Sequence, residues 1–292
     1  MGNIVRKAYG KINLGLDVVG RLENGYHLVK MIMQMVEIYD ELTFEKLPSG
    51  IVITTDSGEL PTDENNLIYK AAKLMLDTYK IDGGVKIHLE KNIPIAAGMA
   101  GGSSDAAQTF HGINELYGIG ADTEALCSLG VKVGADVPYC IVGGTMLAEG
   151  IGEVLSPLPS PPEAYLLIAK PEINVSTKEV YEKIDTEGVE KHPDIDGMIE
   201  ALETGNLQGV VDRLGNVLAT VTEKMHPIIL EIKEAMIECG ALGSLMSGSG
   251  PTVFGIFTDK TEVMNAAKVI EESRLAKQIF VTGFCKGGSH VQ

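Results

Sequence analysis

The segment from residue 94 to residue 107 constrains this chain most, because it is a glycine- and serine-rich loop that runs directly into a helical pattern. It contains three glycines, two serines and no charged side chain before Asp105. Unpaired N–H groups at a helix start, together with the positive end of the helix dipole, form an anion site. A phosphate is the expected ligand. The loop residues expected around it are Pro94, Ile95, Ala96, Ala97, Gly98, Met99, Ala100, Gly101, Gly102, Ser103 and Ser104.

The loop differs from two common phosphate-binding patterns. The Walker A pattern places a lysine before Ser or Thr, whereas Ser103 and Ser104 follow two glycines. The dinucleotide-binding pattern requires G-x-G-x-x-G after a first strand, and the glycines of this loop do not have that spacing. An ordinary turn capped by one of the two serines is the alternative, since serine is favoured at helix N-caps. A phosphate-binding loop of this kind would take its cation from elsewhere in the chain.

Composition and charge limit the partners. The chain has 292 residues and a formal net charge of −16, which allows two domains and argues against binding nucleic acid or an anionic membrane. Backbone dipoles, a few lysines and Mg²⁺ can still reverse the potential inside one cleft. No apolar run approaches a membrane span, and residues 1–7 are too short and polar for a signal peptide. The four cysteines form no C-x-x-C pair, so we expect reduced thiols and a cytoplasmic location.

Strand and helix patterns mix in both halves of the chain, which predicts an α+β protein of two domains. The expected strands cover residues 3–20, 28–46, 51–55, 85–89, 165–169, 242–247, 251–258 and 278–284. The expected helices cover 62–79, the segment after the glycine loop, 122–129, the segment opened by Ser176 and Glu179, much of 194–239, and 261–273. Residues 137–157 predict a hairpin around the glycines at 143–144. The four prolines within residues 156–162 indicate a linker, so we place the domains at 1–160 and 161–292.

Three further segments carry residues suited to chemistry. Lys11 lies in an otherwise apolar strand, where it either faces solvent or pairs with an anion, because an unpaired buried lysine is costly. Asp136 precedes an expected strand, and it is either a turn residue or a general base for an attacking hydroxyl. Residues 247–252 form a second glycine loop, which is either a hairpin turn or a binding loop. Together these features match phosphoryl transfer, which needs mainly positioning and charge stabilisation, and Lys11 would supply the missing cation.

These motifs resemble those of the GHMP kinases. Residues 94–107 are similar to the phosphate-binding motif of that superfamily, and the lysine strand and residues 247–252 are similar to its other two motifs. The likeness spans essentially the whole chain. It implies a GHMP kinase fold with an N-terminal mixed β/α domain, a C-terminal ferredoxin-like α/β sandwich and an active site in the cleft between them. In one departure, Tyr9 and Gly10 stand where the family usually has Pro and Ala ahead of the lysine.

Within the superfamily, the residues around Lys11, Tyr26 and Asp136 are similar to those of kinases that use ATP and Mg²⁺ to phosphorylate a cytidine-diphosphate-linked polyol on the non-mevalonate isoprenoid route. The resemblance implies that Asp136 is the general base and that Lys11 stabilises developing charge. It also implies that residues 94–104 wrap the ATP phosphates, with Ser103 or Ser104 near Mg²⁺. The residues that it assigns to the substrate are Asn13, Tyr26, His27, Tyr181, Gly248, Ser249 and Gly250; Tyr26, His27 and Tyr181 would hold the cytosine by stacking and edge hydrogen bonds.

Two alternatives stay open at this point. One is another GHMP kinase, acting on homoserine, mevalonate or a sugar. An aromatic residue next to a histidine, as in Tyr26 and His27, argues against it, because a small polar acceptor has no evident use for a base-binding pair. The other is a nucleotide-binding module without catalysis, which the presence of both Lys11 and Asp136 argues against. We expect a small-molecule substrate and either a monomer or a homodimer.

Overall fold

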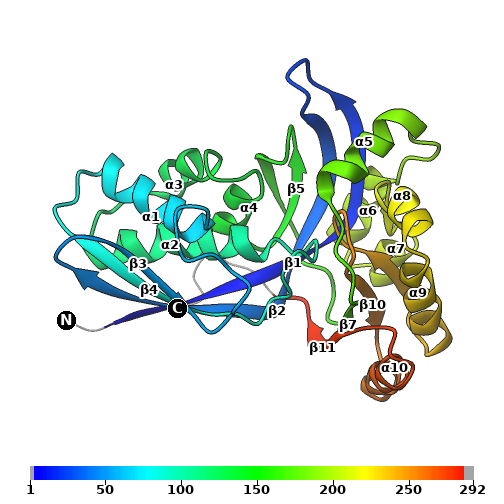
Figure 1. Cartoon of the computed structure of the whole chain (residues 1–292). Coiled ribbons are helices and arrows are strands. Elements are labelled where there is room, and N and C mark those ends of the chain that lie inside the picture. Colours follow the sequence, from blue (N-terminus) through cyan, green and yellow to red (C-terminus); the bar gives the residue numbers. More distant parts are fainter. Residues whose placement is uncertain (1–2, 286–292) are drawn as a thin grey trace.

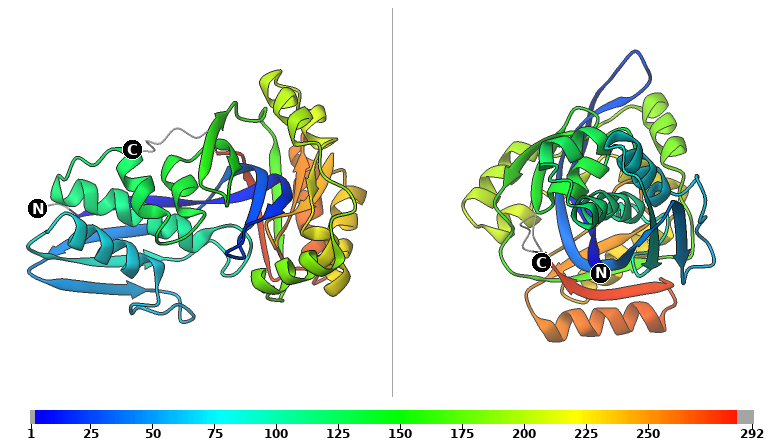
Figure 2. Two further views of the ribbon diagram at one scale, coloured as in Figure 1. Left: turned by 90° about the horizontal axis from the view of Figure 1, so that it is seen from above. Right: turned by 90° about the vertical axis from the view of Figure 1, so that its left-hand side faces the viewer.

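Two β-sheets with helices packed around them form the framework of the protein (Figures 1 and 2). The computed structural model describes residues 3–285. The first sheet consists of β1 (Ile4–Arg21), β2 (His27–Leu47), β3 (Gly50–Thr55), β4 (Gly84–Glu90), β5 (Thr145–Glu149), β6 (Val154–Leu158) and β8 (Gly215–Asn216). The second consists of β7 (Tyr165–Lys170), β9 (Gly243–Met246), β10 (Val253–Phe257) and β11 (Gln278–Gly283). The helices are α1 (Leu67–Thr78), α2 (Gly101–Tyr117), α3 (Thr123–Gly130), α4 (Val137–Val142), α5 (Thr177–Glu187), α6 (Ile195–Glu203), α7 (Leu207–Val211), α8 (Ala219–Met225), α9 (Ile228–Glu238) and α10 (Lys260–Glu272).

The long antiparallel hairpin of β1 and β2 is the centre of the first sheet, which has the order β3-β4-β2-β1-β8. The hairpin β5–β6 joins this sheet through β2, and the pairs β3–β4 and β1–β8 are parallel. The register of β1 and β2 shifts between Tyr9 and Lys11. Irregularities of this kind re-aim side chains and are frequent beside active sites. Lys11 therefore comes directly after a break in the regular pairing.

The sequence predicts a helix directly after the glycine loop, and α2 begins at Gly101, inside the loop, so that Gly101, Gly102, Ser103 and Ser104 form its first turn. Its apolar positions Ala106, Ala107, Phe110 and Ile113 recur with helical spacing and are fully buried against the first sheet. Ala100 precedes the helix in the left-handed conformation, and no side chain caps the helix start. The first N–H groups of α2 consequently remain available to an external acceptor.

The second sheet is antiparallel throughout, with the order β11-β7-β10-β9, and α9 and α10 pack on it. It shares a hydrophobic core with the first sheet, in which Ile12 and Leu14 of β1 pack with Leu166 of β7 and Phe254 of β10. Helix α6 contributes Met198 to the same core. This common core fixes the position of the sheets relative to each other, and with it the walls of any cleft between them.

The chain passes from the first sheet to the second between β6 and β7 and later returns, because β8 pairs with β1 at residues 15 and 16. The division into units near residue 160 stays a prediction. The return of β8 means that residues on both sides of the proline-rich segment contribute to the first sheet.

Two of the sequence predictions are wrong in detail. Residues 137–142 form helix α4 rather than a strand, because Pro138 fits the first turn of a helix, and Gly143 ends the helix with a positive φ of 76°. The hairpin is β5–β6, which begins after the two glycines. The proline-rich segment begins inside β6, where Pro157 is tolerated because β6 pairs only with β5 and is an edge strand.

A buried charge cluster lies beneath the glycine loop. The ammonium group of Lys91 pairs with Asp40 and lies 2.9 Å from Asp105, and all three side chains are almost completely buried. Asp40 also accepts hydrogen bonds from the backbone N–H groups of Asn92 and Ile93, at 2.6 and 2.7 Å. Burial raises the pKa of the Asp105 carboxyl well above its usual value, although Lys91 opposes that shift. The cluster links β2, the segment after β4, and the first turns of α2.

We predict that Lys91→Met destabilises the protein by about 3–5 kcal/mol, because it leaves two buried carboxylates without their cation. Urea unfolding followed by circular dichroism measures the loss. The matched control is Lys86→Met on β4, where the ion pair with Glu45 is partly exposed and the expected loss is below about 1 kcal/mol. Equal losses in the two variants would contradict a structural role for the buried cluster.

Candidate active site

Lys11 is held in a fixed position inside the protein. Its side chain is 5% exposed, and its ammonium group donates to the Oδ1 atom of Asn13 at 2.7 Å and to the carbonyl of Gly98 at 3.0 Å. Burial lowers the pKa of Lys11, whereas the charge of Asp136 opposes that effect. A buried ammonium group with neutral hydrogen-bond partners keeps most of its charge unneutralised. It therefore favours an anion in its neighbourhood.

The carbonyl of Gly98 joins Lys11 to both glycine loops. It accepts a second hydrogen bond from the hydroxyl of Ser247, at 2.9 Å, in the loop between β9 and β10. Gly98 has a φ of 71°, and a Cβ atom placed on it would lie 2.3 Å from the carbonyl oxygen of Ser247. The two loops thus meet backbone to backbone, in a contact that only glycine allows.

The two serines at the start of α2 have different environments. Ser104 is fully buried, and its hydroxyl donates to the carbonyl of Tyr9 at 2.7 Å. Ser103 is partly exposed and lines cavities on both sides of the glycine loop. Of the two hydroxyls, that of Ser103 is therefore the one positioned to contact a ligand.

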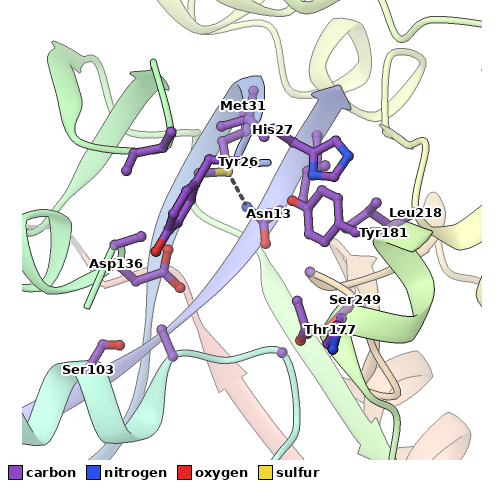
Figure 3. A pocket seen from close by; sticks show the side chains of 18 of the residues that line it. Asn13, Tyr26, His27, Met31, Ser103, Asp136, Thr177, Tyr181, Leu218 and Ser249 are labelled. Carbon is purple, nitrogen blue, oxygen red and sulfur yellow. Dashed lines mark hydrogen bonds between the residues drawn. The ribbon is translucent and has the colours of Figure 1, made fainter. Parts of the chain in front are cut away.

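Asp136 stands at the start of α4 and faces the same cleft as Lys11. Its side chain makes no capping hydrogen bond to the helix, although it occupies the N-cap position. Asp136 therefore does not act as a helix cap. Its carboxylate is directed to the cleft, where Figure 3 shows it between Ser103 and Tyr26.

The cleft has a volume of about 670 Å³, and its walls come from β1, β2, the glycine loop with the start of α2, α5 and the loop between β9 and β10 (Figure 3). Tyr26 lies on one side, and His27 and Tyr181 lie on the other. The rings of His27 and Tyr181 are stacked, with centroids 4.6 Å apart. Burial, with the charge of Asp136 adding to it, raises the pKa of Tyr181 to about 12, which keeps its phenol neutral. The cleft is thus an aromatic slot with a carboxylate and an ammonium group at its base.

The structure brings most of the predicted residues together. Those that line the cleft are Lys11, Asn13, Tyr26, His27, Gly98, Ala100, Ser103, Asp136, Tyr181, Gly248 and Ser249. A second cavity of about 350 Å³ lies on the other side of the loop and is lined by Pro94, Ile95, Ala96, Ala97, Gly98, Ala100, Gly101, Gly102 and Ser103, together with Asn65 and Lys91. Met99, Ser104 and Gly250 are buried and line neither cavity.

Asn13 differs from the other predicted substrate contacts, because its amide is already engaged inside the protein. It accepts the hydrogen bond from Lys11, and its Nδ2 atom lies 3.4 Å from the sulfur of Met31 (Figure 3). Its side chain is fully buried. In this structure Asn13 orients Lys11.

Asn216 is a residue that sequence reasoning missed. It lies on β8, and its amide nitrogen donates to the carbonyls of Met246 and Gly248, each at 2.8 Å. Its amide oxygen accepts from the N–H of Leu218 at 2.9 Å. Asn216 thereby holds the second glycine loop against β1, and a single asparagine in a helix-rich stretch gives no sequence signal of that role.

Helix α5 supplies a second group of missed residues. Thr177 and Asp185 line the cleft with Tyr181, at intervals of four residues, so that all three lie on one helix face. Ser176 caps this helix by accepting from the N–H of Glu179, as its sequence predicts. Asp185 could have been predicted from the sequence. It follows Tyr181, which was already a candidate substrate contact, by four residues, and residues at that spacing share a helix face.

The chain belongs to the GHMP kinases. Residues 66–144 match the family described as GHMP kinases N terminal domain, and residues 194–274 match GHMP kinases C terminal. Curated relatives named 4-diphosphocytidyl-2-C-methyl-D-erythritol kinase include one from Lachnospira eligens, 52% identical over 97% of this chain and 98% of its own length. Another, from Caldicellulosiruptor saccharolyticus, is 46% identical over 97% of each chain.

Solved structures agree with this assignment. A crystal structure of 4-(cytidine 5'-diphospho)-2C-methyl-D-erythritol kinase matches with a TM-score of 0.83 and 32% identity, over 97% of this chain and all of the other. A homoserine kinase from Cytophaga hutchinsonii matches with a TM-score of 0.77 and 21% identity, over 99% of this chain and 95% of that one. The second match concerns the fold alone. The predicted GHMP kinase fold is confirmed.

We predict that Gly98→Ala impairs phosphoryl transfer, because a methyl group there forces the two glycine loops apart. The expected loss in kcat/KM is at least about tenfold, since small displacements of positioning groups are costly. Gly118→Ala is the control, because Gly118 has a similar φ of 62° but open space around it. Both variants carry the backbone strain of a left-handed alanine, but only Gly98→Ala should lose activity in a kinase assay. Equal activity in the two variants would contradict the proposed importance of the loop contact.

Proposed function

We propose that this protein transfers the γ-phosphoryl group of ATP to the 2-hydroxyl of 4-diphosphocytidyl-2-C-methyl-D-erythritol, on the non-mevalonate route to isoprenoid precursors. The names of its relatives support this substrate. The geometry supports the reaction, because the cleft and the second cavity have Gly98, Ala100 and Ser103 in common at the start of α2. The boundary that these three residues form between the two cavities is the main structural support for the proposal. A nucleotide in the second cavity would present its terminal phosphate at the boundary, facing an acceptor in the cleft.

Asp136 is the general base in this proposal. It takes the proton of the acceptor hydroxyl as that oxygen attacks the γ-phosphorus and the bond to the β–γ bridging oxygen breaks. Lys11 stabilises the negative charge that develops on the transferred group, and its fixed hydrogen bonds keep it in position without reorganisation. The N–H groups at the start of α2 hold the phosphates.

Mg²⁺ fits this site as an ion bound mainly by the nucleotide. Within residues 3–285, no three His, Cys, Asp or Glu side chains are grouped as metal ligands. Magnesium usually keeps several waters and takes phosphate oxygens with only one or two protein ligands. The hydroxyl of Ser103 is available for this role, and Ser104 is not, because its hydroxyl is buried on Tyr9. The ion would neutralise phosphate charge during transfer.

The aromatic slot is the proposed site of the cytosine. Tyr26, which is 58% exposed, and Tyr181 lie on opposite sides of the cleft, and His27 stacks on Tyr181. Stacking on tyrosine combined with edge hydrogen bonds suits a pyrimidine base. Gly248 and Ser249 also line the cleft, and the polyol would lie beside Gly248, which is close to the ammonium group of Lys11.

This slot favours the cytidine substrate over homoserine, mevalonate or a sugar, since the fold alone is common to kinases of all these kinds. A non-catalytic module is disfavoured, because Lys11 and Asp136 face the same cleft. No helix within residues 3–285 is long and apolar enough to cross a membrane. We retain the predictions of a cytoplasmic location, no nucleic-acid or membrane partner, and a monomer or homodimer.

The substrate assignment is tested with purified protein, ATP and Mg²⁺. We predict conversion of 4-diphosphocytidyl-2-C-methyl-D-erythritol to its 2-phosphate, with homoserine, mevalonate and galactose left unchanged, as followed by phosphorus NMR. Comparable turnover of any of those three compounds would overturn the assignment.

We predict that Asp136→Asn and Lys11→Ala each lower kcat by at least about 100-fold, as expected for a general base and for a charge-stabilising group. Lys30→Ala is the matched control, because Lys30 is paired with the exposed Asp196 and does not line the cleft. Steady-state kinetics with both substrates saturating give the values. A variant with near wild-type kcat would remove that residue from the mechanism.

A further inference from the structure

The imidazole of His27 is held from two directions. Its face stacks on Tyr181 with an interplanar angle of 27°, and its Nε2 atom lies 2.7 Å from the Oδ1 atom of Asp185. The His27 side chain is only 12% exposed. The ring therefore has a fixed orientation in the wall of the cleft before any substrate binds.

Asp185 is itself held by a cation. Its Oδ2 atom lies 3.1 Å from the Nη1 atom of Arg21, which belongs to the end of β1. Each carboxylate oxygen thus has a separate partner, one on β1 and one on β2. A carboxylate offers only acceptors, so the hydrogen bond to Asp185 requires the proton of His27 to be on Nε2.

This pairing determines what the other nitrogen offers. In a neutral imidazole with its proton on Nε2, Nδ1 is a hydrogen-bond acceptor. Within the described part of the chain, we find no protein partner for Nδ1. The edge of cytosine carries an amino group, which donates, whereas the corresponding group of uracil is a carbonyl, which only accepts. An acceptor at Nδ1 therefore suits cytosine and opposes uracil.

We propose that Asp185, held by Arg21, is a positioning residue that makes the cleft selective for a cytosine nucleotide over a uracil nucleotide, by fixing the tautomer of His27. This inference rests on the proposed function, because it assumes that the base lies in the aromatic slot. Asp185 acts through His27 and does not itself contact the base.

The test compares kcat/KM for the cytidine-diphosphate-linked polyol and its uridine-diphosphate-linked analogue at about pH 8. We expect the wild-type protein to prefer the cytidine compound by about 10- to 100-fold, which is the range of one good base-edge contact. In Asp185→Asn, an amide can either donate or accept, so either histidine tautomer is allowed. The preference should fall at least about fivefold, with much of the change in KM.

Two further variants separate positioning from general damage. Asp185→Glu retains a carboxylate and should retain most of the preference. Glu187→Gln removes a charge from the same helix, at an exposed pair with Lys224, and should leave the preference unchanged. Thermal unfolding of each variant verifies that it is folded.

The outcomes distinguish this inference from the proposed function. An Asp185→Asn variant that loses activity equally on both compounds, with an unchanged preference, would overturn the inference and leave the proposed function intact. A wild-type protein that shows no preference would do the same. If the wild-type protein turned over neither compound, the proposed function would fail, and this inference with it.

Discussion

The carbonyl oxygen of Gly98 is the point on which the arrangement of the site depends. It accepts from the ammonium group of Lys11 and from the hydroxyl of Ser247, so one atom connects the first strand, the glycine loop before α2 and the loop of the second sheet. The absence of a side chain at Gly98 allows this approach. Because the two sheets also share a hydrophobic core, a movement of one loop would have to be accommodated by the other.

The groups that favour an anion at the site lie close to it, although the chain as a whole is negatively charged. The protein has a net charge of −16, yet the cleft contains a buried ammonium group and the uncapped start of a helix. These groups act on a phosphate at short range, where a low dielectric strengthens them, whereas the surface carboxylates are screened by salt. Burial weakens the hold of Lys11 on its proton, and Asp136 partly restores it. The carboxylate of Asp136 therefore helps to keep Lys11 charged inside the protein.

Local sequence patterns predicted a helix or strand correctly where neighbouring residues in the sequence determine its structure. The helix after the glycine loop and the capped start of α5 are of this kind, because loop chemistry and apolar spacing determine them. Asp136 was predicted to precede a strand and instead precedes α4, since a short buried helix and a buried strand have similar compositions. The requirements of phosphoryl transfer grouped Lys11 with Asp136, and the family resemblance added Tyr26. Asn216 and the pairing of His27 with Asp185 depend on contacts between segments far apart in the chain, which no local pattern encodes.

The two-residue strand β8 also has a consequence for the order in which the protein is completed during synthesis. It adds to β1 almost 200 residues after β1 has been made, and Asn216 within it then holds a loop that is made later still. The amino-terminal part of a chain emerges and folds first. The glycine loop before α2 is therefore made early, but the cleft is complete only after the segment from β9 to β10, which contributes Gly248 and Ser249, has left the ribosome.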